Sequence, residues 1–129
     1  MKRRICLKAL VTGVTAVPLF AASGTAAIQL HVDLQVNPAR EREMLHIFHT
    51  RFARAAAKQP GFIEIKMLKL RKTLQGSSPG SANYRFLLSF QTEEDRQKWI
   101  ATPIHKKLWP TIEATLFSKN YTVLLYDVE

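Results

Sequence analysis

One histidine and two tryptophans in the C-terminal third of the sequence are the side chains best suited to carry chemistry. His105 can change its protonation near neutral pH, so it is the leading candidate for a catalytic acid, base or hydrogen-bonding group. It could instead brace its helix next to Trp109, one turn further on. Trp99 and Trp109 could line a substrate-binding aromatic pocket, although tryptophans on apolar helix faces also serve as ordinary core residues.

Two pairs of polar residues fall on segments that alternate like strands. His31 and Asp33 are two positions apart, so they share a strand face and could act together on a ligand or across a dimer seam. A solvated strand face explains the same pattern. Tyr84 and Arg85 could hold an oxyanion as substrate-binding groups. Consecutive strand residues point to opposite faces, so at most one of these two is expected to reach a given cavity.

Neither a metal site nor a cofactor site is predicted. His46 and His49 have a spacing that can hold a metal, but no further ligand is evident nearby and we expect a solvated helix margin there. The only cysteine, Cys6, lies in the N-terminal segment. Nothing supports a Ser-His-Asp triad, a nucleotide-binding loop or a repeat array.

The N-terminal segment has the layout of a secretory signal, which we place at residues 1–27. The basic residues come first, and they are Lys2, Arg3, Arg4 and Lys8. An apolar stretch, residues 9–22, follows them and runs into small residues. The paired arginines fit a twin-arginine signal as well as an ordinary Sec signal. Because the apolar stretch is broken by Gly13 and Pro18 and is shorter than the roughly 20 residues of a membrane span, we expect no stable anchor after cleavage.

The remaining chain, residues 28–129, is predicted to form one periplasmic or secreted bacterial domain. It has 129 − 27 = 102 residues, enough for one packed core, and it lacks cysteine. Its formal charge is 19 − 4 − 10 = +5. Lysine and arginine are spread along the chain without a basic tract, so nucleic-acid binding is not expected.

Hydrophobic periodicity predicts the order strand, helix, strand, strand, helix, strand. Asn37-Pro38, Thr92 and Thr102-Pro103 supply helix starts, and Pro110 is expected to bend or shorten the last helical segment. The strands are expected at 28–36, 62–70, 83–91 and 121–129, with the first helix ending before 59–61 and a surface loop at 71–82. This is the ferredoxin-like α+β pattern, an antiparallel βαββαβ sheet with its helices on one face.

Apolar residues on both faces of the later strands predict a homodimer. In the second strand, alternation puts Ile63, Ile65 and Met67 on one face and Phe62, Leu68 and Leu70 on the other. Helices from one chain cover only one face. A second copy is therefore expected to shield the other, giving a dimeric α+β barrel.

The sequence also resembles the antibiotic-biosynthesis-monooxygenase domains over residues 28–129. Two landmarks carry the resemblance: Pro60-Gly61-Phe62 after the first helix, and Thr102-Pro103-Ile104-His105 after Trp99. The chain departs from common family patterns, with Leu88 and Phe90 where an acidic residue and a tryptophan often stand. Trp99 stands where quinol-oxidising relatives often have a histidine, and Trp109 where a heme-degrading subgroup uses one.

The resemblance implies a homodimeric monooxygenase that oxidises a small aromatic or quinol-type substrate without a cofactor. An electron-rich, deprotonated phenol can itself reduce dioxygen, so such a protein need only exclude water and place polar groups. His105 occupies the family's recurring Pro-x-His position. Two alternatives remain open: a non-catalytic dimeric binding module for a hydrophobic ligand or heme, and a barrel that assembles with another exported protein.

Overall fold

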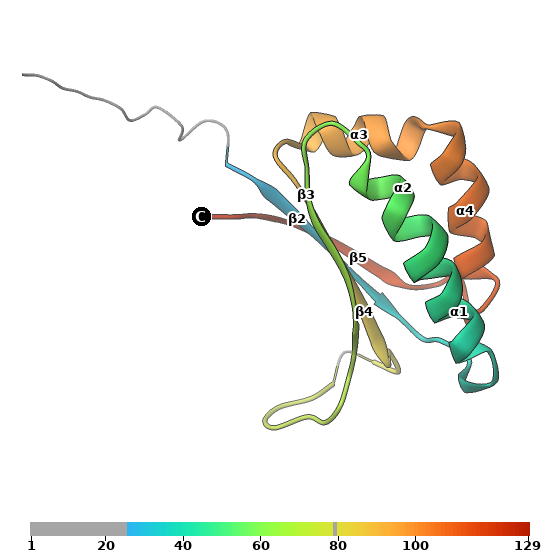
Figure 1. Cartoon of the computed structure of the whole chain (residues 1–129). Helices are drawn as coiled ribbons and strands as arrows, with labels where there is room; N and C mark the ends of the chain where they lie inside the picture. Colours follow the sequence, from blue (N-terminus) through green and yellow to red (C-terminus); the bar gives the residue numbers. More distant parts are fainter. Residues whose placement is uncertain (1–25, 79) are drawn as a thin grey trace, which may run out of the picture.

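The computed structural model describes residues 26–78 and 80–129, which form an antiparallel sheet with helices on one side (Figure 1). All but the last two residues of the predicted signal segment lie outside the described part of the chain. No helix of the described residues is long and apolar enough to cross a membrane.

The four strands are β2 (Ile28–Leu34), β3 (Phe62–Lys69), β4 (Tyr84–Phe90) and β5 (Thr122–Asp127). They lie in the order β3-β4-β2-β5, and every neighbouring pair is antiparallel. The first strand in the chain therefore sits inside the sheet, between the third and the fourth. This order confirms the ferredoxin-like topology predicted from the sequence.

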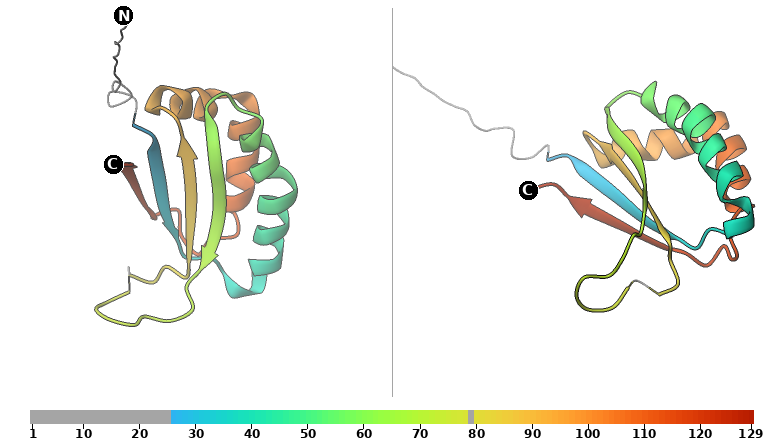
Figure 2. Two further views of the ribbon diagram at one scale, coloured as in Figure 1. Left: turned by 60° about the vertical axis from the view of Figure 1, so that its left-hand side comes forward. Right: turned by 60° about the horizontal axis from the view of Figure 1, so that its bottom comes forward.

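Two helical layers cover one face of this sheet, the front face (Figures 1 and 2). The first runs from the 3-10 turn η3 (Pro38–Arg40) through α1 (Glu41–Ile47) and the π-helical segment η4 (Phe48–Phe52) to α2 (Ala53–Ala57). The second consists of α3 (Glu93–Ala101) and α4 (Pro103–Glu113). The predicted caps are present, since the side chains of Asn37, Thr92 and Thr102 each accept a backbone hydrogen bond. Pro110 does not shorten α4, which continues for three more residues.

The core lies between the helices and the front face of the sheet. Alternate residues of β2 and β4 point into it, and the first helical layer adds Met44, Phe48, Phe52 and Ala56. Trp99, Leu108 and Ile112 come from α3 and α4. Among residues 26–78 and 80–129, every buried residue falls between Ile28 and Thr115, so this part of the chain contains a four-stranded sheet with its own packed core.

The start of β3 differs from the predicted alternation. An irregularity in the register between Phe62 and Glu64 adds one residue to this strand relative to β4. As a result Phe62 packs against the core beside Phe90, at 6.2 Å between ring centroids, while Ile63 is 45% exposed. The prediction that Ile63 shares a face with Ile65 and Met67 was therefore wrong.

No helix of the described chain covers the other face of the sheet, the back face (Figure 1). It carries the polar side chains of β2 and β4 together with apolar groups on the outer strands, among them Leu68, Leu124 and Tyr126. The β3–β4 connection projects beyond the sheet on this side (Figure 2).

Candidate functional site

A cavity of about 110 Å³ lies between the helices and the front face of the sheet. Apolar side chains form most of its wall, and the polar exceptions are His105, Arg96 and the hydroxyl of Tyr121. The lining residues are Leu30, Val32, Phe52, Phe86, Leu88, Arg96, Trp99, Ile100, His105, Trp109, Tyr121 and Val123. Three of these residues, His105, Trp99 and Trp109, were predicted from the sequence as candidate site residues, and the fold brings all three together.

His105 is held at the start of α4 against an aromatic cluster. The Thr102 hydroxyl accepts a hydrogen bond from the backbone N–H of His105 at 3.2 Å, which fixes the first turn of the helix. The imidazole meets the Trp99 ring edge to face at 5.0 Å and lies nearly parallel to Trp109 at 6.4 Å. Phe52, which η4 places over the sheet, completes the enclosure at 5.8 Å. The ring is thus fixed by packing on three sides.

The surroundings of His105 favour its neutral form. Burial lowers the pKa of the imidazole from its usual value of 6.5, and the positive charge of Arg96 lowers it further. The carboxylate of Glu113 opposes both effects. A neutral imidazole at pH 7 can accept a proton, so His105 is suited to act as a base.

Arg96 is the main site residue that sequence reasoning missed. Its guanidinium donates two hydrogen bonds of 2.6 Å to the Glu93 carboxylate, and its side chain is only 15% exposed. This fork fixes the cation at the cavity wall. The Glu93-x-x-Arg96 spacing on a helix was the available signal, but such pairs also occur on solvated helix faces.

Tyr121 was also missed, and it joins the cavity wall to a carboxylate. The Trp109 Nε1–H donates to the Tyr121 hydroxyl at 2.8 Å, and that hydroxyl donates to Glu113 Oε2 at 2.7 Å. Burial raises the pKa of Tyr121, and its hydrogen bond to Glu113 raises it further. The phenol therefore stays protonated and orients Trp109. Trp99, with 1% exposure, serves as core and cavity wall at once.

His31, Asp33 and Arg85 lie on the back face, on the opposite side of the sheet from the cavity. Arg85 donates two hydrogen bonds to the Asp33 carboxylate, at 2.7 and 3.1 Å. The Nε2 atom of His31 is 2.8 Å from Gln29 Oε1, and its ring packs against Tyr126 at 4.7 Å. The fold does not bring these three residues together with His105.

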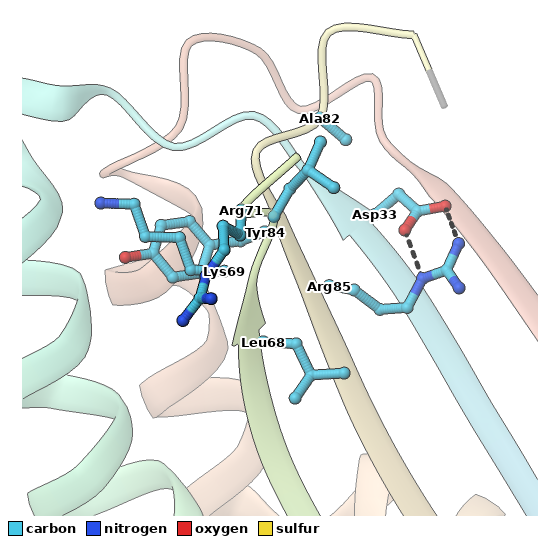
Figure 3. A pocket seen from close by; sticks show the side chains of 8 residues that line it. Asp33, Leu68, Lys69, Arg71, Ala82, Tyr84 and Arg85 are labelled. Carbon is cyan, nitrogen blue, oxygen red and sulfur yellow. Dashed lines mark hydrogen bonds and ion pairs between the residues drawn. The ribbon is translucent and has the colours of Figure 1, made fainter. Parts of the chain in front are cut away.

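Tyr84 points to the front face, away from its neighbour Arg85. Its hydroxyl donates to the Glu41 carboxylate, and burial together with this hydrogen bond raises the pKa of Tyr84. A separate hollow of about 310 Å³ at the ends of β3 and β4 is bordered by both Tyr84 and Arg85. Figure 3 shows the Asp33–Arg85 pair on one side of the strands and Tyr84 with Lys69 on the other. Neither residue lines the cavity of His105.

The described residues contain no cluster of three or more histidine, cysteine, aspartate or glutamate side chains that could hold a metal ion. His46 and His49 are both exposed, at the margin of the first helical layer as predicted.

Solved structures share this fold at low sequence identity. A conserved protein from Methanosarcina mazei superposes with a TM-score of 0.67 at 14% identity, covering 85% of this chain and 100% of that one. A candidate antibiotic biosynthesis monooxygenase from Caulobacter crescentus gives 0.65 at 17% identity, covering 81% and 92%. A variant of SnoaB, a cofactor-independent oxygenase from Streptomyces nogalater, gives 0.64 at 16% identity, covering 81% and 94%.

No protein-family model matches the sequence. No curated protein matches it either. Sequence identities this low show a shared fold and nothing more. The chain therefore has the fold of the antibiotic biosynthesis monooxygenases.

Proposed function

We propose that this chain, which has the fold of the antibiotic biosynthesis monooxygenases, is an oxygenase that oxidises a small phenol or quinol without a cofactor. The observation that carries the proposal is the composition of the cavity. A histidine poised to accept a proton and a fixed arginine face a space walled by five aromatic side chains. SnoaB, named as a cofactor-independent oxygenase, has the same fold.

The polar groups match the needs of a phenol that reacts directly with dioxygen. His105 takes the phenol proton, and the Arg96 guanidinium stabilises the resulting phenolate and the oxygen anion formed as dioxygen is reduced. A phenol with a free para carbon then reacts with one O₂ to give one quinone and one water, and a quinol with a free ring carbon gives one hydroxyquinone and one water. One oxygen atom enters the ring and the other leaves as water, so the four electrons lost by the ring reduce the dioxygen completely.

The size of the cavity suits a substrate with one aromatic ring. A cavity of about 150 Å³ lined by apolar groups binds benzene, and the present cavity is somewhat smaller, at about 110 Å³. We therefore expect the cavity to accept a single phenol ring after a small expansion. A polycyclic substrate or a porphyrin would require the aromatic cluster around Phe52 to separate.

Oxygen uptake tests the proposal. Purified protein should consume dioxygen above the autoxidation rate with single-ring phenols or hydroquinones and not with three-ring analogues. Uptake equal to autoxidation across a broad single-ring panel would remove the proposal. Activity confined to polycyclic substrates would contradict the size argument and leave the chemistry standing.

A binding module for an apolar ligand is the second candidate, favoured by the many apolar groups around the cavity. Trp99 and Trp109, where relatives often carry reactive groups, are here part of an aromatic cluster that also includes Phe52 and Phe86. Calorimetry separates the two functions, because a module would bind single-ring ligands without turnover. A heme-binding module does not suit this protein, because heme is larger than the cavity of about 110 Å³. We therefore expect no Soret shift on heme titration.

We also propose that the partner of this protein is a second copy of the same chain, packed against the back face of the sheet. Leu68, Leu124 and Tyr126 are each at least 39% exposed there, and the Asp33–Arg85 pair, in which the carboxylate is buried and the arginine is 38% exposed, lies between them. A sheet packed against this face would remove the apolar groups from water. Sedimentation at micromolar concentration should give a dimer.

Export to the periplasm or beyond, directed by the N-terminal segment, remains part of the proposal and is tested by fractionation of cells.

A further inference from the structure

The outer surface of the two helical layers carries a groove with a high density of positive charge. The groove has a volume of about 620 Å³ and runs between η4 and α2 on one side and α4 on the other. No acidic side chain lines the groove. Four cationic side chains do, and they are Arg51, Arg54, Lys58 and Lys107. We call these four residues the groove cations. None of them forms an ion pair among residues 26–78 and 80–129.

Helix stability does not explain this arrangement. Arg51 and Arg54 are three residues apart on one continuous helical stretch, and Arg54 and Lys58 are four apart, so both pairs bring like charges together. Such pairs destabilise a helix. Lys58 at the end of α2 is favoured by the helix dipole, but Lys107 lies in the first half of α4, where the dipole gives no such benefit.

The uncharged residues that line the groove indicate which kind of anionic partner it would bind. Ile104, which is 37% exposed, lies between the cations, with the buried side chain of Leu108 beneath the groove, and the lining contains no aromatic side chain on which nucleic-acid bases could stack. Long basic side chains beside an exposed aliphatic group suit a protein that lies on a membrane surface, with the charged ends among phosphates and the stems against the lipid boundary.

From these observations we infer that the groove cations dock the protein on the phosphate headgroups of an anionic phospholipid membrane. The contact is peripheral and requires no inserted helix. The groove lies on the helix side of the molecule, opposite the back face, so a second copy on that face leaves it free. The inference does not depend on the reaction proposed for the cavity.

Vesicle co-sedimentation of residues 26–129 tests the inference, because these residues include the four-stranded sheet with its packed core and lack the apolar N-terminal segment. The protein should bind vesicles of phosphatidylcholine and phosphatidylglycerol mixed three to one, and should not bind vesicles of phosphatidylcholine alone. Each cation near an anionic surface strengthens binding roughly fivefold. Replacing all four groove cations by glutamine should therefore weaken binding by several hundredfold, on the order of 600-fold if they act independently.

A matched control removes the same charge elsewhere. Arg71, Lys72, Lys98 and Lys119 likewise form no ion pair among the described residues, and their replacement by glutamine should weaken binding less than tenfold, because distant charges are screened. Circular dichroism confirms that both variants fold. Equal losses in the two variants, or no preference for anionic vesicles, would overturn the inference. So would tight binding to duplex DNA or to polyphosphate, lost on changing the groove, without vesicle binding.

Discussion

Replacing His105 by glutamine should separate its role as a base from its role in packing. Glutamine can still donate and accept hydrogen bonds in the space between Trp99 and Phe52 but does not titrate near neutral pH. An ordinary phenol has a pKa of about 10, so at pH 7 only about one molecule in a thousand is ionised without help. If His105 supplies the phenolate, its loss should lower kcat/KM at pH 7 by up to about a thousandfold, within the usual range for general-base catalysis.

The pH profile provides the decisive readout of this variant. Because burial and Arg96 lower the pKa of His105 from 6.5, the wild-type rate should stay constant above about pH 6.5 and fall only in more acidic solution. The His105→Gln rate should instead rise with pH until the substrate itself ionises, and should approach the wild-type rate near pH 10.

Oxygen uptake from pH 5 to 10 measures both profiles, and His49→Gln serves as a control because His49 is exposed on the first helical layer. A His105→Gln enzyme with the wild-type rate at pH 7 would refute the assignment of the base. A loss that persists unchanged at pH 10 would show that the imidazole acts by packing.

Three further predictions concern stability, each measured by urea denaturation. As pH falls below about 6.5, the unfolded chain binds a proton at residue 105 before the folded chain does, so the free energy of unfolding should fall. His105→Phe removes this contribution, so its free energy of unfolding should fall less steeply. Some fall should remain, because the pKa of His31 is also lowered. Arg85→Gln leaves the Asp33 carboxylate, 9% exposed, without its partner and should cost about 2 kcal/mol, whereas Lys66→Gln, in an exposed pair, should cost less than about 1 kcal/mol; equal costs would contradict the assigned burial. Gly61→Ala puts a Cβ at φ +80° and against the Asp95 carboxylate, so it should cost more than about 1 kcal/mol, and Asp95→Ala should recover part of that loss.

The topology could be predicted because local and global signals agree. Strict alternation in β2 and β4 specified which side chains face the helices, and capping residues specified where the helices begin. The error at Phe62 and Ile63 has a local cause, since one extra residue in a strand reverses the face of every residue before it, and nothing in the residue types marks that extra residue.

The candidate site was predictable only where one helix pair carries it. His105, Trp99 and Trp109 are close in sequence, so a common wall on α3 and α4 was one of the two interpretations that the sequence allowed. The contributions of Arg96, Tyr121 and Phe86 depend on how the sheet and helices pack, which periodicity does not encode. The groove cations were missed for the same reason, because Arg51 and Lys107 are distant in sequence and meet only where η4 lies beside α4.

Reaction with isotopically labelled dioxygen tests the central claim most directly. Wild-type protein, freed of metals by a chelator, is mixed with the best single-ring phenol and labelled O₂, and the quinone is examined by mass spectrometry. The account predicts one labelled oxygen atom in each quinone formed, with His105→Gln slowing its formation at pH 7. A quinone without label, or labelling at the same rate in the variant, would contradict the claim that a phenolate reacts with dioxygen beside His105.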